Sequence, residues 1–265
     1  MPENAPKDSA FMLGALGILA YAASMMTHEA LGHGGFCLAV GGHNAMLTAW
    51  AERCNFPNVQ PSGIEAAGPG LQFGAGLLAW LPLHRLPAEA VRLRYFFWLY
   101  LIFNLFVSSG YVAFSGITDF GDAAVIIAGL SPRIIWRVVL ILLGAGVYYL
   151  SMRLAASELK RFVGANAGSR SLFRLVWIPY VTAGVFACCA GALNRTMAPG
   201  VALGLAAASS FGAGFGMLRL PDMQRQMPMR TTIAGGYLSW SVGWVLAALV
   251  VVAAFLFIIG PGVER

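Results

Sequence analysis

The chain has 265 residues, of which 58% are hydrophobic and only 11% are charged. Because soluble globular domains carry about 25% charged residues, this composition excludes an ordinary soluble protein and predicts an integral membrane protein. The net charge of +6 does not indicate nucleic-acid binding, because the basic residues lie between apolar runs and form no basic run with interleaved aromatic residues.

Seven uncharged runs predict membrane-spanning helices, and most of them reach the ~20 residues that cross ~30 Å of hydrocarbon. The runs cover residues 9–27, 66–83, 95–118, 138–152, 175–194, 196–218 and 231–263. The fourth run is the shortest and becomes a full span if it begins at Ile134. We therefore expect an all-α, polytopic membrane bundle of about seven transmembrane helices, surrounded by the lipid bilayer.

The basic residues predict the orientation of this bundle. Cytoplasmic loops of membrane proteins carry an excess of Lys and Arg. We therefore expect a cytoplasmic N-terminus and a C-terminus outside, because this orientation leaves few basic residues on the outer side. Those few are Arg53, Arg133, Arg137, Arg195 and Arg265.

The two halves of the chain differ in character, although no internal repeat or linker divides them. Residues 1–132 hold all four histidines and predict a metal-site membrane core of three spans and a re-entrant segment. Residues 133–265 predict additional transmembrane helices of the same membrane domain, joined by basic loops. We expect the chemistry to lie in the first half.

Two segments between the predicted spans have a character of their own. Residues 41–63 are rich in Gly, Pro and Asn and predict an external loop with room for a short β-hairpin. Residues 115–131 begin with a polar turn and continue with too few uncharged residues to cross a bilayer. This second segment predicts a re-entrant or interfacial element packed on protein.

The four cysteines predict no metal site. Cys37 and Cys54 lie toward the outer side, where a disulfide is chemically possible. Because the chain contains no CxxC spacing of the metal-binding type, we expect buried free thiols.

The segment His28-Glu29-Ala30-Leu31-Gly32-His33 carries the candidate chemistry. Glu29 is the one formally charged side chain between Ser9 and Ala51. An ionisable group inside a membrane span costs a few kcal/mol and by default indicates a functional site. The alternative is a glutamate near a helix end that pairs with a histidine.

The spacing of the two histidines is similar to the zinc-protease signature HExxH, with one additional residue. Positions i and i+4 of a regular α-helix lie about 40° apart around the axis, whereas i and i+5 lie about 140° apart. A π-bulge would bring both imidazoles to one side, and Gly32 makes local unwinding inexpensive. The alternative is a regular helix on which Glu29 and His33 share a face. We favour the bulge.

Three segments in chain order resemble the intramembrane metalloproteases of the site-2 protease family. The first is the histidine segment, and the second is Ala66-Ala67-Gly68-Pro69-Gly70, which opens the next span as the Ala-Gly-Pro motif of that family does. The third is the turn after the following span, where the family places an aspartate as the third zinc ligand. The resemblance covers roughly residues 10–130, about half of the chain.

This resemblance implies a Zn²⁺ site held by His28, His33 and an aspartate of the turn, which offers Asp119 and Asp122. We favour Asp122 as the ligand, although a helix N-cap is the commoner place for a Gly-Asp-Ala-Ala sequence. Glu29 would then be the catalytic general base and proton shuttle. On the expected topology the first and third spans end on the same side, so these groups can meet.

The sequence therefore predicts a zinc-dependent intramembrane peptidase that acts on a membrane-anchored protein. The alternative is a non-proteolytic metal-binding membrane protein of the same ancestry, such as an accessory subunit that binds partner subunits of a larger complex. A transporter is less well supported, because it would need ionisable residues in several spans and these are scarce beyond the first.

Overall fold

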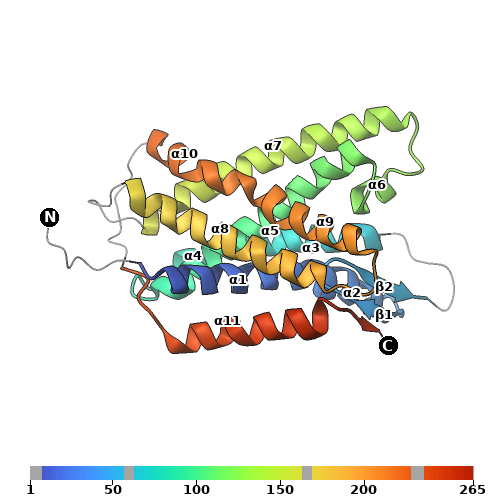
Figure 1. The fold of residues 1–265 in the computed structure, drawn as a ribbon. Coiled ribbons are helices and arrows are strands. Elements are labelled where there is room, and N and C mark those ends of the chain that lie inside the picture. The colour runs from blue at the N-terminus through green and yellow to red at the C-terminus, as the bar shows by residue number, and fades with distance from the viewer. Residues whose placement is uncertain (1–7, 57–62, 163–168, 228–235, 265) are drawn as a thin grey trace, which may run out of the picture.

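Long helices lying side by side make up most of the molecule (Figure 1). The computed structural model describes residues 8–56, 63–162, 169–227 and 236–264. Within these residues, six helical segments are long and apolar enough to cross a membrane, and each overlaps one of the runs predicted from the sequence. The segments are Ala10–Ala39, Val91–Thr118, Arg133–Phe162, Leu172–Ala192, Gly200–Gln226 and Val242–Ile259.

Several of these segments consist of consecutive helices. The first contains α1 (Ala10–Met26), the π-helix η1 (Thr27–His33) and α2 (Gly34–Ala39). The next four contain α5 (Val91–Thr118); α7 (Arg133–Leu159) with η2 (Lys160–Phe162); α8 (Ser169–Ala192); and α9 (Pro199–Ala207) with η3 (Ala208–Gly212), η4 (Phe215–Arg219) and α10 (Leu220–Gln226). The last contains α11 (Val242–Ala254) and η5 (Phe255–Ile259).

The predicted run 66–83 differs from the others, because it falls on two short helices. These are α3 (Ile64–Leu78) and α4 (Trp80–Arg85), which meet at Ala79. The segment predicted to be re-entrant or interfacial contains α6 (Asp122–Ile126), a helix of 5 residues, packed against α3 and α5. This segment was expected to begin at residue 115, but α5 continues to Thr118, so the segment begins after that residue.

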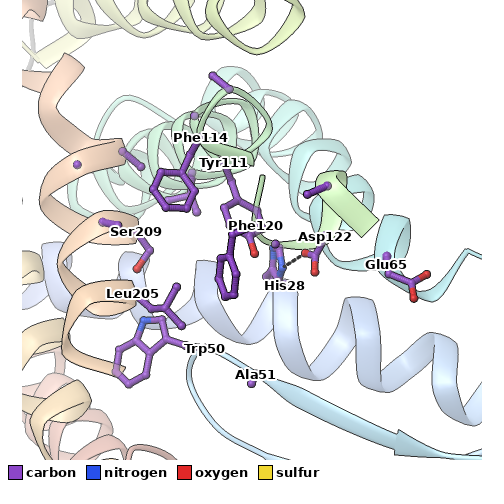
Figure 2. A pocket seen from close by; sticks show the side chains of 18 of the residues that line it. His28, Trp50, Ala51, Glu65, Tyr111, Phe114, Phe120, Asp122, Leu205 and Ser209 are labelled. Carbon is purple, nitrogen blue, oxygen red and sulfur yellow. Dashed lines mark hydrogen bonds and ion pairs between the residues drawn. The ribbon is translucent and has the colours of Figure 1, made fainter. Parts of the chain in front are cut away.

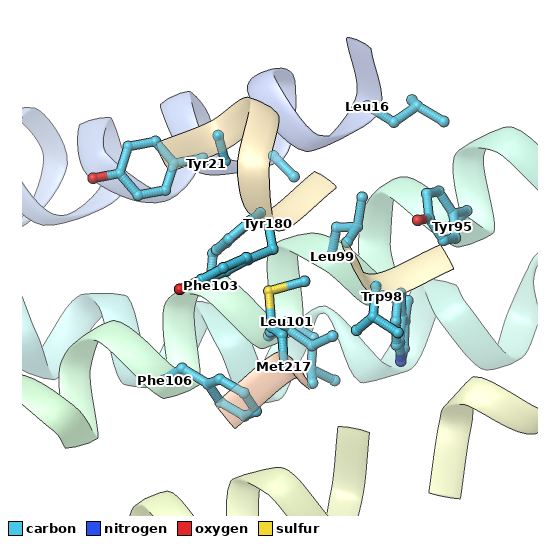
Figure 3. Packing of buried hydrophobic residues seen from close by; sticks show 14 of the residues in the cluster. Leu16, Tyr21, Tyr95, Trp98, Leu99, Leu101, Phe103, Phe106, Tyr180 and Met217 are labelled. Atoms are coloured by element: carbon cyan, nitrogen blue, oxygen red, sulfur yellow. The ribbon is translucent and has the colours of Figure 1, made fainter. Parts of the chain in front are cut away.

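Helix α5 lies at the centre of the bundle. It packs against α1, α3 and α7, and its side chains between Tyr95 and Phe106 include most of the largest fully buried ones. Figure 3 shows Phe103 of α5 beside Tyr21 of α1, and their ring centroids are 5.5 Å apart. Tyr180 of α8 and Met217 of η4 complete this cluster, so both halves of the chain contribute to one core.

Helices α7 and α11 differ from α5, because they turn most of their apolar side chains outward. In an apolar stretch of 18 residues in each of these two segments, only 11% of the residues are buried. A water-soluble protein rarely exposes apolar patches of this extent, whereas a helix in contact with lipid does so. This distribution fits the membrane bundle expected from composition.

A small antiparallel sheet lies at one end of the bundle (Figure 1). Strands β1 (His43–Leu47) and β2 (Glu52–Asn55) form the predicted hairpin. The chain end adds β3 (Val263–Glu264) on the other side of β1, which gives the order β2-β1-β3. The all-α expectation therefore needs this correction, which the sequence concealed because β3 is only 2 residues long.

The expectation of buried free thiols at Cys37 and Cys54 is wrong, because the two residues form a disulfide. Their Cα atoms are 5.9 Å apart, close to the commonest separation for a disulfide. The bond joins α2 to β2. Sequence spacing did not reveal it, because the hairpin register brings Cys54 beside the end of the first helical segment.

We expect a thiol count to detect this disulfide. In denaturant without reductant, a maleimide reagent should label Cys188 and Cys189 alone, because these are the free cysteines. After reduction all four cysteines should be labelled, and the Cys37→Ala variant should show three labels without reduction, since Cys54 loses its partner. Mass spectrometry of the intact protein gives the count, and four labels on the unreduced wild type would contradict the disulfide.

Candidate metal centre

The π-helix η1 brings the two histidines of the first segment together. It spans Thr27–His33, which is the distortion predicted from the spacing of the histidines. The ring centroids of His28 and His33 are 4.9 Å apart, and their Nε2 atoms are 3.2 Å apart. Both rings and Glu29 are buried. The alternative, a regular α-helix on which Glu29 and His33 share a face, is therefore wrong.

A tight turn after α5 delivers the third donor. Asp119 ends α5 in the left-handed conformation with φ of 57°, and Gly121 follows with φ of 91°. This turn places the Asp122 Oδ2 atom 3.3 Å from the Nε2 atoms of both His28 and His33. Figure 2 shows the carboxylate of Asp122 facing His28 across the site.

Asp119, the alternative ligand, lies elsewhere. Its side chain is partly exposed and forms an ion pair with Arg133, with an Nη2 to Oδ1 distance of 2.7 Å. The hydrogen bond from Arg133 lowers the pKa of Asp119, so this carboxylate stays charged and remains on the guanidinium. Of the two aspartates in the turn, only Asp122 faces the imidazoles.

The three donor atoms have the spacing that a tetrahedral ion requires. Their separations are 3.2 Å between the two nitrogens and 3.3 Å from each nitrogen to the oxygen. Zinc binds histidine nitrogen and carboxylate oxygen at about 2.0–2.2 Å. Two ligands at that distance on a tetrahedron lie about 3.3 Å apart, so the triangle fits one face of a zinc site and leaves the fourth position open.

Hydrogen bonds fix both imidazoles in the tautomer that ligates a metal. His33 Nδ1 donates to the backbone carbonyl of Ile64 at 2.7 Å, and a carbonyl can only accept. His28 Nδ1 donates to Oε1 of Gln72 at 3.0 Å. The amide of Gln72 is oriented by its own Nε2, which donates to the hydroxyl and the carbonyl of Ser24. Each neutral ring therefore directs a lone pair on Nε2 toward the site.

The charge at this point calls for a cation. Burial raises the pKa of Asp122, but hydrogen bonds that it accepts from protonated Nε2 atoms of His28 and His33 outweigh burial and lower its pKa to about 2, so the carboxylate is anionic. If a metal ion took the place of those protons, this carboxylate and two imidazole lone pairs would converge on it. Such groups are costly to bury together unless a proton or a metal ion lies between them.

Two glycines allow α3 to approach the π-helix closely. A Cβ atom on Gly32 would lie 2.6 Å from the Cα of Gly68, and a Cβ on Gly68 would overlap the imidazole of His33. Gly68 belongs to the Ala-Gly-Pro segment noted in the sequence. This contact explains the segment physically, because it lets Ile64 and Gln72 of α3 reach the two imidazoles.

A large cavity opens beside the three donors. Its volume is about 1170 Å³, and its wall is mostly apolar. Figure 2 shows Tyr111 and Phe114 of α5 on one side and Trp50 and Leu205 on the other, with His28 and Asp122 between them. Helices α7, η3 and η4 also line it. The second half of the chain thus supplies wall to the cavity, although the candidate ligands all lie in the first half.

Sequence reasoning missed the residues that support the ligands. Gln72 is the one polar side chain within the run 66–83, which was a detectable signal. It lies four positions after Gly68 and eight after Ile64, so these three share one face of α3. The carbonyl of Ile64 gave no signal, because any residue supplies the same group.

Comparison with known proteins adds no family assignment. A scan of family models, a search of curated proteins and a search of solved structures found no match to this chain. Any function proposed for this chain therefore depends on the geometry of the site.

We expect Asp122→Asn to remove metal binding and Asp119→Asn to leave it unchanged. The two aspartates lie in the same turn, but only Asp122 faces the histidines. Loss of a direct ligand should weaken zinc affinity by more than the ~10–100-fold typical of outer partners. Competition with a chromophoric chelator in detergent solution measures this affinity. Equal affinities for the two variants would contradict the assignment of Asp122.

A second comparison tests the glycine contact. Gly68→Ala should displace the imidazole of His33 and reduce zinc affinity about 10–100-fold, as loss of a supporting interaction does. Gly70→Ala is the matched control, because it lies two residues further along α3 and its Cβ would meet no atom within 4 Å. The same titration applies, and an unchanged Gly68→Ala protein would show that α3 does not set the position of His33.

Proposed function

We propose that this protein is a zinc-dependent intramembrane peptidase that hydrolyses a peptide bond of a membrane-anchored protein. The observation that carries the proposal is the triangle formed by His28 Nε2, His33 Nε2 and Asp122 Oδ2, with separations of 3.2–3.3 Å. Two histidines and one carboxylate with an open fourth position are typical of catalytic zinc. The resemblance of three segments to the site-2 protease family supports the same assignment.

The bundle is proposed to cross the membrane seven times. Six crossings correspond to the long apolar segments, and α3 together with α4 supplies the seventh. The start of α1 and strand β3 lie at opposite ends of the bundle, as an odd number of crossings requires (Figure 1). The distribution of basic residues favours a cytoplasmic N-terminus, which places the site near the outer surface together with the hairpin.

A zinc ion held by His28, His33 and Asp122 would supply a bound water molecule whose pKa lies near ~7. Glu29 would accept a proton from this water as its oxygen bonds to the carbonyl carbon, and would return the proton to the amide nitrogen as the C–N bond breaks. The position of Glu29 suits this role, because its carboxylate lies on the cavity wall next to the ligands. Among the residues the structure describes, its side chain has no hydrogen-bond partner that would compete for the proton.

The surroundings of the site suit a substrate that comes from the bilayer. The cavity wall consists mainly of aromatic, aliphatic and alanine side chains. Moving an apolar segment of a membrane-anchored protein from lipid into such a cavity would cost little free energy, because both surroundings are apolar. Tyr111 packs beside His28, with ring centroids 6.0 Å apart, and so limits access to the ligands from that side.

We expect Glu29→Gln to abolish cleavage without loss of the metal. Replacement of a general base typically lowers a rate about 10²–10⁴-fold, whereas the three ligands remain in place. The assay uses a panel of single-span membrane reporters with a fluorescent tag, reconstituted with the protein in liposomes. Glu89→Gln is the control, because Glu89 is exposed in a loop away from the cavity.

The result separates the peptidase from the accessory-subunit alternative. Zinc bound at one ion per chain, with reporter cleavage in wild type and in Glu89→Gln but not in Glu29→Gln, supports the peptidase. Zinc bound without any cleavage that depends on Glu29 overturns it and favours a non-proteolytic metal protein.

A further inference from the structure

A second carboxylate, Glu52, faces the cavity outside the ligand set. It is the first residue of strand β2 and lines the same cavity as Glu29 and His33. Figure 2 shows Trp50 and Ala51, the two residues before it, on the wall opposite Tyr111 and Phe114. The start of β2 is therefore part of the surface that a bound substrate would touch.

Glu52 is half-buried, and one of its two carboxylate oxygens lacks a hydrogen-bond partner among the residues that the structure describes. This atom, Oε1, is enclosed by protein and accepts no hydrogen bond there. The basic side chains on the cavity wall do not pair with it: Arg53 is exposed and follows it in a strand whose side chains alternate between faces, and Arg133 is held by Asp119. Arg219 lies on η4 and forms no ion pair with it.

An unpaired carboxylate in this position is costly and selects for a cation. Burial is the largest cause that raises the pKa of Glu52, to about 7. Removing a carboxylate from water without a partner is expensive, and an opposite charge restores much of that free energy. The oxygen does not belong to the triangle of His28, His33 and Asp122, so it is not a further ligand of that ion.

We propose that Glu52 binds a lysine or arginine side chain of the substrate, close to the bond that is cleaved. This inference rests on the proposed function, whose membrane-anchored substrate it specifies further. The apolar cavity accepts the membrane-embedded part of the substrate, and Glu52 lies where that segment leaves the cavity at the hairpin end of the bundle. A basic residue bordering the membrane segment is the natural group to reach it.

The test measures binding, so that it does not require turnover. The probes are single-span peptides with a fluorescent label that carry one Lys, moved residue by residue along the end of the span, and matched peptides with Gln at the same position. Dissociation constants are measured in lipid nanodiscs with zinc-loaded protein. Three proteins are compared: one that retains Glu52, the Glu52→Gln variant and the Glu52→Lys variant. All three also carry Glu29→Gln, which prevents cleavage. Glu65→Gln, a second carboxylate on the cavity wall, is the matched control.

For at least one position we expect the Lys peptide to bind about tenfold or more tightly than the Gln peptide, because a partly buried charge pair forms. Glu52→Gln should remove the preference, Glu52→Lys should reverse it for a peptide with Glu at that position, and Glu65→Gln should keep it. Zinc content reports that each variant remains folded at the site.

Two results would overturn the inference: no preference for Lys at any position, or an equal preference in Glu52→Gln. The proposed function fails separately from it. If binding depends on the charge of the peptide but the protein that retains Glu29 cleaves no reporter, the peptidase function is refuted and recognition by Glu52 still holds. Cleavage of reporters without charge preference would refute recognition by Glu52 alone.

Discussion

The close contact between the π-helix η1 and α3 at Gly32 and Gly68 determines the geometry of the whole site. The π-helix brings two histidines five positions apart to one side of the first segment. The glycine contact then lets α3 supply the acceptors that orient both rings, the carbonyl of Ile64 and the amide of Gln72. The histidine segment and the Ala-Gly-Pro segment are therefore one structural unit, because neither would place a donor atom correctly without the other.

Helix α5 connects this unit to the third donor. Its buried aromatic side chains hold it against α1, so the turn at its end is fixed relative to the histidines. Two arginines of α7 secure that turn. Arg137 donates hydrogen bonds to the carbonyls of Gly116 and Ile117 at the end of α5, and Arg133 holds Asp119. Because Asp119 pairs with Arg133, the next carboxylate in the turn, that of Asp122, is the one that faces the two histidines.

Much of this arrangement was predictable from sequence, and the part that was not depends on contacts between distant segments. Composition predicted the helical bundle, and the spacing of His28 and His33 predicted the π-helix, because both are local properties of the chain. The choice between Asp119 and Asp122 was not local, since Arg133 decides it from another helix. The disulfide of Cys37 depends in the same way on the register of the hairpin.

The charges of the site suit the divalent ion that we propose. When both imidazoles are neutral, the groups around the triangle include two carboxylates, those of Glu29 and Asp122, and no buried lysine or arginine lies among the described residues of the cavity wall. A divalent ion would balance these two carboxylates. Without a metal ion, protons on the Nε2 atoms of His28 and His33 would do so, and the hydrogen bonds from their Nδ1 atoms to Ile64 and Gln72 would remain. The glycine contact, the left-handed turn and the two oriented imidazoles meet at one point, and together they support the proposal that this site holds a metal ion.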